Sequence, residues 1–334
     1  MIDFSHPDIK TAIDSVTEAA RLARHLQTEL RHGPATSGQR LDKADRSPVT
    51  VADFAVQAVI ARSLSRAFPQ DPLVAEESIH LLQGETGLST PTLTQVRDIV
   101  ARLHPEAREA DIVDWIGRGI GPVAPRFWVL DPIDGTKGFL RGDQFAIALA
   151  LMVDGQVELG VLGCPVLSLG DNTDGGSLVV ARRGHGTWAC PLEHPGAFKR
   201  LHVSAVSGAK TARILHSVES AHINFAALDQ FKKSLDTEAQ SIAMDSQAKY
   251  ATLAAGQADC LIRLASRERP RRDESIWDHA AGTLIVEEAG GTVTDLDGKP
   301  LDWRAGITLS HNRGTLASNG LLHNQALRAI GQMS

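Results

Sequence analysis

The chain has 334 residues, of which 43% are hydrophobic and 22% charged, and its formal net charge is −6 at pH 7. This composition is ordinary for a globular protein in water, and the acidic balance argues against unspecific binding to nucleic acid. The sequence contains no run of 18 apolar residues, the length that a membrane-spanning helix needs. Residues 1–10 lack the basic-then-apolar pattern of a leader. The three cysteines (Cys164, Cys190, Cys260) are far apart in the sequence, as is typical of a reducing compartment. We therefore expect a cytoplasmic protein with one large layered domain or two domains.

The first half of the chain predicts helices followed by an antiparallel sheet. Residues 8–32 carry apolar side chains three and four positions apart, and a second helix follows Thr50 and continues to about residue 68. Residues 71–77 predict a short strand. The stretch 144–162 alternates around Asp154-Gly155, which is a strong hairpin signal.

Residues 83–125 are the least regular part of this half, with Gly, Thr, Pro and charges around one amphipathic helix at 93–103. We interpret them as an insertion or a lid. A composition break near 191–196 then indicates a boundary. The sequence therefore predicts an N-terminal domain over 1–195 and a C-terminal domain over 196–334.

The second half alternates between the two kinds of element. We expect strands at 213–218, 241–244 and 259–264, helices at 224–234, 248–255 and 279–288, and a last strand pair after them. An antiparallel first half and an alternating second half suggest stacked helix and sheet layers. The predicted fold class is therefore α/β, in the broad sense that includes α+β.

The most informative motif lies in the middle of the chain. Asp131 and Asp134 end the apolar stretch 127–130, with Pro132 between them and Gly135-Thr136 after them. Pro132 keeps Asp131 extended, and Gly135-Thr136 opens an element whose first N–H groups have no partner within it. Two hard oxygen ligands beside free donors suit Mg²⁺ on one side and a phosphate on the other. The alternative is an acidic turn in which Asp134 caps a helix.

Three further acidic positions each have an ordinary alternative. Asp53 follows Thr50 at a helix start, where its alternative role is capping. Glu76-Glu77 follows an apolar strand, so one side chain points inward, and the alternative is two surface acids. Asp278 precedes an apolar helix and would otherwise serve as its N-cap. Each position is weak evidence when taken alone.

In chain order, the strings P-V-T-x-A-D, A-E-E-S, D-P-I-D-G-T and W-D-H-A-A-G resemble the lithium-sensitive, Mg²⁺-dependent phosphomonoesterase superfamily. That superfamily includes inositol monophosphatase and fructose-1,6-bisphosphatase. The longer strings that begin at Asp131, His216 and Met244 look like its 3′(2′),5′-bisphosphate nucleotidase branch. The resemblance runs from about residue 9 to about residue 320. It implies a layered αβαβα sandwich of the inositol monophosphatase and fructose-1,6-bisphosphatase type.

The resemblance also implies a role for each matching position around the reaction. The implied metal ligands, for two or three Mg²⁺ ions, are Glu76, Asp131, Asp134, Asp278 and the main-chain carbonyl of Ile133. Gly135 and Thr136 would bind the scissile phosphate, while Asp53 and Thr136 would orient or deprotonate the attacking water. Ala75 is a departure, because the family usually has Gly before Glu-Glu, and it puts little in doubt.

A second set of matching positions would hold the nucleotide. It consists of His222, Ser246, Lys249 and Arg263. Lys249 and Arg263 are the expected charge partners of the phosphate that is not cleaved. Without the surrounding motif, they would be an ordinary helix-surface lysine and strand-end arginine. Most metal ligands would thus lie in the N-terminal domain and the nucleotide-binding residues in the C-terminal one.

The resemblance implies hydrolysis of the 3′-phosphate of adenosine 3′,5′-bisphosphate to AMP and phosphate, by attack of a metal-activated water. It also implies activity on PAPS, the sulfated relative of that nucleotide, a place in sulfur assimilation and inhibition by Li⁺. The expected partner is a small nucleotide bisphosphate, with no nucleic-acid polymer and no membrane, and the oligomeric state stays open, a monomer included. Two alternatives remain, a phosphatase of inositol mono- or polyphosphates and a sensor that binds metal or nucleotide without catalysis. The complete acid set and Thr136 favour an enzyme.

Overall fold

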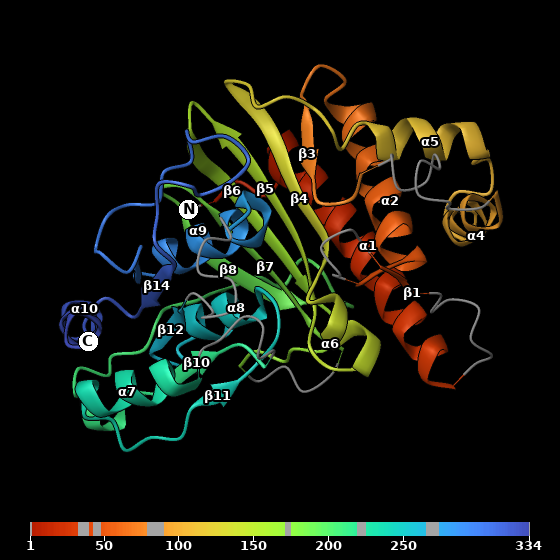
Figure 1. Ribbon diagram of the computed structural model, residues 1–334. Coiled ribbons are helices and arrows are strands. Elements are labelled where there is room, and N and C mark those ends of the chain that lie inside the picture. Colours follow the sequence, from red (N-terminus) through yellow and green to blue (C-terminus); the bar gives the residue numbers. More distant parts are fainter. Residues whose placement is uncertain are drawn as a thin grey trace.

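The computed structural model describes residues 2–32, 40–42, 48–78, 90–170, 175–218, 225–264 and 274–333. Its elements stack as five layers in the order helix, sheet, helix, sheet, helix (Figure 1). The predicted αβαβα arrangement is confirmed. Over the described ranges, no helix combines the length and the apolar character that crossing a bilayer requires.

The first outer layer consists of helices. They are α1 (Pro7–His32), α2 (Val51–Ala67), α4 (Thr90–Val100) and α5 (Glu109–Gly117), and the small antiparallel pair β1 (Arg40–Asp42) and β2 (Pro48–Thr50) precedes α2. The helices predicted at 8–32 and before residue 68 are confirmed.

The region predicted as an insertion or lid is part of this layer instead. From residue 90 onward it holds α4 and α5, and α5 was not predicted. Val96, Ile112 and Ile116 are fully buried and belong to the same apolar core as α1 and α2. The lid interpretation is therefore wrong for these two helices, because their apolar sides pack on α2. Residues 83–89 lie outside the described ranges.

The first sheet has seven strands in the order β3-β4-β5-β6-β7-β8-β9. They are β3 (Leu73–Ala75), β4 (Arg126–Asp134), β5 (Ala146–Val153), β6 (Gln156–Cys164), β7 (Ser177–Arg182), β8 (Gly186–Pro191) and β9 (Lys199–Arg200). All neighbours pair antiparallel except β3 and β4, which are parallel. The predicted hairpin is confirmed, since Asp154 and Gly155, with φ of 49° and 75°, supply the two left-handed residues of a tight turn.

The middle layer holds α8 (Ala248–Ala254), α9 (Ala280–Glu288) and the short 3₁₀ helix η3 (Ile276–Asp278). Glycine allows these elements to lie close together. A Cβ added at Gly160 of β6 would lie 2.7 Å from the carbonyl oxygen of Ala281, and one at Gly282 would lie 2.3 Å from the ring of Tyr250. The start of α9 can therefore pack directly on the first sheet and on α8.

The second sheet has five strands in the order β11-β10-β12-β14-β13. They are β10 (Ile214–His216), β11 (Ile242–Ala243), β12 (Cys260–Arg263), β13 (Thr292–Thr294) and β14 (Thr315–Ser318). The last layer on its outer face consists of α7 (Phe225–Leu235) and α10 (His323–Gly331), and η1 (Ala209–Thr211) precedes β10. The helix α10 was not predicted. Residues of α9 and of the first sheet belong to one apolar core, which crosses the predicted domain boundary between residues 195 and 196. The division into two domains stays a prediction.

Candidate functional site

The carboxyl end of β4 brings two acidic side chains to one face of the first sheet. Asp131 pairs with Ala148 of β5, whereas Asp134 pairs with Ala146, so β4 has one residue more than β5 in this interval. Such a bulge is where a proline fits, because Pro132 cannot donate to the ladder. Side chains alternate along a strand, and residues 131 and 134 would otherwise face opposite sides. The bulge therefore turns both carboxylates toward the middle helix layer.

A third carboxylate reaches the same point from that layer. Asp278 ends η3, immediately before α9, and oxygens of Asp131, Asp134 and Asp278 all lie within 4.8 Å of one another. We call these three residues the carboxylate cluster. The predicted convergence of acidic side chains from distant segments is confirmed for these three.

The cluster holds more negative charge than it can easily keep. Burial, and next to it the charge of Asp278, raises the pKa of Asp134 to about 7. Burial also raises the pKa of Asp278, with Glu76 adding to the effect. Close carboxylates that share a site ionise together only when something positive compensates them. The arrangement is electrostatically ready for a cation.

Glu76, the fourth predicted ligand, lies outside the group of three but acts on it through its charge. It is half-buried just after β3, and its N–H donates to the carbonyl of Leu130 at 3.1 Å. The next residue is clamped by Gln57 of α2, whose amide donates to the carbonyl of Glu77 at 2.7 Å and accepts from its N–H at 3.2 Å. The surface-acid alternative is wrong for Glu77, which is 1% exposed.

The donor set fits a hard cation. All the cluster ligands are carboxylate oxygens, which Mg²⁺ and Ca²⁺ prefer over the nitrogen and sulfur ligands of zinc sites. For Asp134 and Asp278 the capping alternatives fail, because the N-cap positions are Gly135 for α6 (Thr136–Arg141) and His279 for α9, and neither makes a side-chain cap bond. Asp134 and Asp278 are thus placed beside these helix starts without capping them.

Thr136 lies between the cluster and α2. Its hydroxyl lies 3.1 Å from the carbonyl oxygen of Ile133 and 3.3 Å from the carboxylate of Asp53. A hydroxyl has one proton, so it can donate to only one of these acceptors at a time. Asp53 is fully buried in the first turn of α2. Asp53 and Thr136 are therefore in contact, and their expected role at the attacking water stays a prediction.

Two cationic side chains border the cluster. Lys249 of α8 is 5% exposed and donates to the carbonyl of Met244 at 3.1 Å. Burial lowers its pKa to about 8, although Asp134 opposes that shift. Arg263 at the end of β12 is half-buried, and its positive charge, like that of Lys249, lowers the pKa of Asp134. The surface-lysine alternative is therefore wrong for Lys249.

Sequence reasoning missed the partner of Arg263. Glu274 lies 2.9 Å from Arg263 Nε and 2.9 Å from His279 Nε2, and Thr315 donates to it at 3.1 Å. Burial alone would raise the pKa of this carboxyl, but Arg263 and then His279 hold it well below its usual range. No local pattern in the sequence marks Glu274 as this partner.

Ser246 meets the cluster from the loop before α8. Its φ is 63°, in the left-handed region that favours glycine, and its hydroxyl accepts from the N–H of Ala248 at 3.2 Å. Gly135 also has a left-handed φ, 85°, and a Cβ there would lie 3.0 Å from Ser246 Cβ. The predicted phosphate and nucleotide positions Gly135 and Ser246 are thus in contact. His222 lies outside the described residues.

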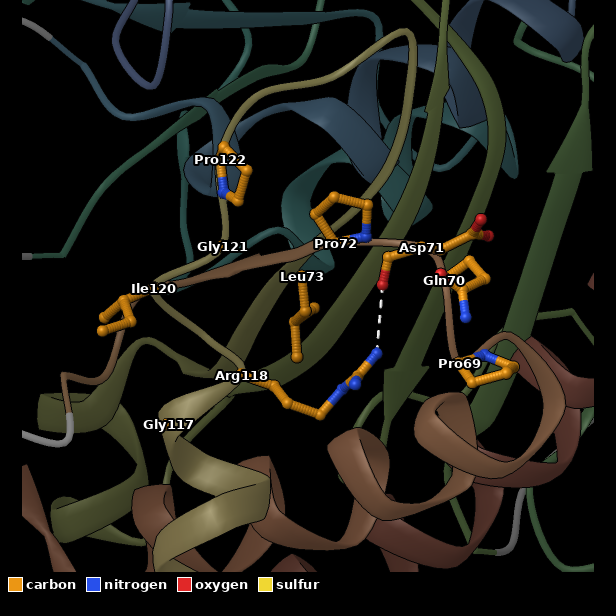
Figure 2. Close-up of a pocket in the computed structure, with 10 residues that line it drawn as sticks. All are labelled: Pro69, Gln70, Asp71, Pro72, Leu73, Gly117, Arg118, Ile120, Gly121 and Pro122. Carbon is orange, nitrogen blue, oxygen red and sulfur yellow. Dashed lines mark hydrogen bonds between the residues drawn. The ribbon is translucent and has the colours of Figure 1, made fainter.

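A shallow surface pocket of about 270 Å³ lies at the other end of β3. It is lined by residues 69–73 and 117–122 without 119, and Figure 2 shows the Arg118 side chain donating to the carbonyl of Asp71, at 3.1 Å. The predicted site residues are absent from this lining. The pocket is therefore separate from the carboxylate cluster.

Comparison with known proteins agrees with the geometry. The model of the inositol monophosphatase family matches residues 6–333. A Candida albicans protein named 3′(2′),5′-bisphosphate nucleotidase 2 is 37% identical, with 98% of each chain covered, and a Schizosaccharomyces pombe 3′(2′),5′-bisphosphate nucleotidase is 37% identical over 97% of this chain and 94% of its own. The solved structure of the Thermotoga maritima IMPase has a TM-score of 0.67 at 22% identity, covering 98% of this chain and 97% of its own, and shows the same fold. The chain belongs to the inositol monophosphatase family, in the branch of the 3′(2′),5′-bisphosphate nucleotidases.

Proposed function

We propose that this protein is a Mg²⁺-dependent phosphomonoesterase that converts adenosine 3′,5′-bisphosphate to AMP and phosphate. PAPS, which would lose its 3′-phosphate in the same way, is a second substrate. The observation that carries the proposal is the carboxylate cluster with two cationic side chains, Lys249 and Arg263, directly beside it. The metal site would bind the phosphate that is cleaved. The two cationic side chains would bind a second phosphate, which is not cleaved. The names of the full-length relatives support the same substrate class.

The residues that would hold two or three Mg²⁺ ions are the carboxylate cluster, Glu76 and the carbonyl of Ile133. When bound, Mg²⁺ neutralises the phosphoryl oxygens, acidifies the attacking water and stabilises the leaving alkoxide. The raised pKa of Asp134, caused first by burial and then by the charge of Asp278, indicates that the cluster by itself opposes its own full ionisation. That self-repulsion supports the assignment of a cation to this place.

The protein's own groups then position the attack. Thr136 orients the water that attacks phosphorus, and Asp53 receives a proton through the Thr136 hydroxyl. The bond between phosphorus and the 3′-oxygen breaks as the new P–O bond forms. The 3′-alkoxide of AMP takes its proton from solvent water, to which Asp53 afterwards returns the proton that it received. Gly135 and Thr136 contribute backbone N–H groups to the phosphoryl oxygens.

The nucleotide is held from the C-terminal half. Lys249 and Arg263 bind the 5′-phosphate as a point charge and a planar fork, with Ser246 and His222 beside them. Glu274 fixes the Arg263 guanidinium through an ion pair of 2.9 Å. Because Arg263 and Lys249 approach the cluster from different elements, a bisphosphate can bridge them and the metals.

The test is a substrate panel with Mg²⁺ that contains adenosine 3′,5′-bisphosphate, PAPS, inositol monophosphate and a sugar phosphate. We expect the highest kcat/KM on the nucleotide bisphosphates. A higher value on inositol phosphate would replace the proposal by the inositol alternative. Asp131→Asn is the matched control for catalysis. Equal phosphate release by this variant and the wild type would instead favour a non-catalytic sensor.

We also propose a cytoplasmic location and a small-molecule partner. Cys164, Cys190 and Cys260 are all buried and free of disulfides, which supports a reducing compartment. Fractionation of cells that express the tagged protein tests the location.

A further inference from the structure

Gln247 bonds to Asp134 of the carboxylate cluster and to the segment that carries Asp278, without contributing a carboxylate itself. It is 1% exposed, lies directly before α8, and its backbone N–H donates to Asp134 Oδ2 at 2.5 Å. This bond lowers the pKa of Asp134, against the larger effects of burial and of Asp278. The main chain of Gln247 therefore fixes one oxygen of Asp134.

The side chain of Gln247 holds the segment that carries Asp278. Its amide nitrogen donates to the carbonyl of Trp277 at 2.8 Å, and its amide oxygen accepts from the N–H of Gly282 at 2.9 Å. Trp277 precedes Asp278, and Gly282 lies in the first turn of α9, where N–H groups lack partners within the helix. One amide group therefore brackets Asp278 from both sides in the sequence.

The loop that presents Gln247 is held in an unusual conformation. Ser246 has a left-handed backbone, with φ of 63°, which is strained for a residue that has a Cβ. Asp245, one residue earlier, is 4% exposed and forms an ion pair with Arg141 of α6. Strain of this kind persists when the surroundings enforce it, and it concentrates at functional sites. The loop is therefore fixed immediately before Gln247, and α8 begins directly after it.

We propose that Gln247 is a positioning residue that sets the spacing between Asp134 and Asp278 and thereby the affinity for Mg²⁺. The inference rests on the proposed metal site but does not depend on which phosphate ester is cleaved. Glutamine suits the role because its amide has both a donor and an acceptor, which the carbonyl of Trp277 and the N–H of Gly282 require. Glutamate would lose the donor, and methionine of similar length would lose both groups.

The experiment compares Gln247→Met with Gln27→Met in the full-length protein. Gln27 of α1 is a matched control, because it is also buried, at 5% exposure, and its amide donates to two carbonyls, Phe139 at 3.1 Å and Asp143 at 3.0 Å. Calorimetric titration with Mg²⁺ gives the Kd, and thermal unfolding gives the rise of Tm on adding Mg²⁺. Residues that orient metal ligands typically change metal affinity by about 10- to 100-fold when replaced.

We expect Gln247→Met to raise the Kd for Mg²⁺ at least about tenfold and to reduce the Mg²⁺-dependent rise in Tm. Gln27→Met should lower Tm without Mg²⁺ but keep the wild-type Kd. An unchanged Kd in Gln247→Met would overturn the proposal. If that variant does not fold, Gln247→Asn, which keeps the amide but shortens its reach, is judged by the same criterion. Weakened Mg²⁺ binding in a protein that cleaves no nucleotide would refute the proposed function and leave this inference standing.

Discussion

The hydroxyl of Thr136 lies 3.3 Å from the carboxylate of Asp53, although the two residues belong to different elements and lie far apart in the sequence. The carbonyl of Ile133 is the second acceptor, at 3.1 Å. The pair stands directly beside the carboxylate cluster. In the proposed reaction, this contact would give a proton of the attacking water a short path to the buried start of α2.

Replacement of Thr136 by valine removes that path while preserving the shape of the side chain. We expect kcat to fall by roughly 10²- to 10⁴-fold, the usual contribution of a positioned proton acceptor. Thr136→Ser keeps the hydroxyl and should retain most of the activity. Steady-state kinetics at saturating Mg²⁺ measures both variants. A kcat for Thr136→Val within threefold of the wild type would contradict the role.

The burial of Asp134, together with the charge of Asp278, predicts how pH affects the metal-free protein. The pKa of Asp134 is about 7 in the folded chain and 3.8 as its ordinary value. Between these values, the unfolded chain has lost this proton and the folded chain keeps it, so Asp134 makes the folded state less stable as pH rises from about 4 to about 7. Asp134→Asn lacks this penalty.

We therefore expect the Tm difference between Asp134→Asn and the wild type, both in EDTA, to grow in favour of the variant from pH 4 to pH 7. Mg²⁺ should reverse the order at pH 7, because it binds the ionised carboxylates of the wild type. Thermal unfolding in a series of buffers tests both points. A Tm difference that stays constant with pH would count against the raised pKa.

Lys249 predicts an alkaline limit for binding of the uncleaved phosphate. Its pKa is lowered to about 8, mainly by burial, so the side chain loses its positive charge above that pH. We expect kcat/KM for adenosine 3′,5′-bisphosphate to fall above pH 8, and Lys249→Arg to move the fall to higher pH. Lys249→Met should raise KM much more than it lowers kcat.

The control for Lys249 is 3′-AMP, which has the phosphate to be cleaved but lacks the 5′-phosphate. For 3′-AMP, the wild type and Lys249→Met should show the same dependence of kcat/KM on pH above pH 8. Equal alkaline declines for both substrates would place Lys249 outside the binding of the second phosphate.

Gly135 combines a left-handed backbone with a close neighbour. Its φ is 85°, and an added Cβ would lie 3.0 Å from the Cβ of Ser246. Gly184, in an exposed hairpin with φ of 77°, would meet nothing within 4 Å. We expect Gly184→Ala to lose about 1–2 kcal/mol in the free energy of unfolding from the backbone alone, with unchanged kcat.

Gly135→Ala should lose more than that and should also lower kcat, because the neighbouring Thr136 must shift with it. Chemical denaturation and steady-state kinetics on the two variants provide the comparison. Equal destabilisation with unchanged kcat in both would show that the contact with Ser246 is unimportant.

Local patterns predicted the fold where one segment alone determines its structure. The alternation of residues 144–162 with Asp154-Gly155 between two strands requires only neighbouring residues to form a hairpin. The apolar stretch 127–130 before Asp131 likewise forms part of a strand, β4. The helices α5 and α10 were missed, because no strong helical periodicity distinguishes α5 from the irregular sequence around it or α10 from the terminal sequence.

The site was predicted as a set of residues but not as an arrangement. The motif at residues 131–134 indicated two metal ligands, yet the bulge that turns both toward one face depends on the pairing of β4 with β5. Gln247 and Glu274 were missed as supporting residues for a related reason. Their partners come from other elements, and no spacing in the sequence records such contacts.

The carboxylate cluster draws on two layers of the fold, which has a consequence for kinetic stability. Asp131 and Asp134 come from the first sheet, whereas Asp278 comes from the helices packed on it. A cation that requires all three can bind tightly only after these layers have docked. Its stabilisation would then be absent from an early transition state, so it would lengthen the native lifetime and leave the refolding rate nearly untouched.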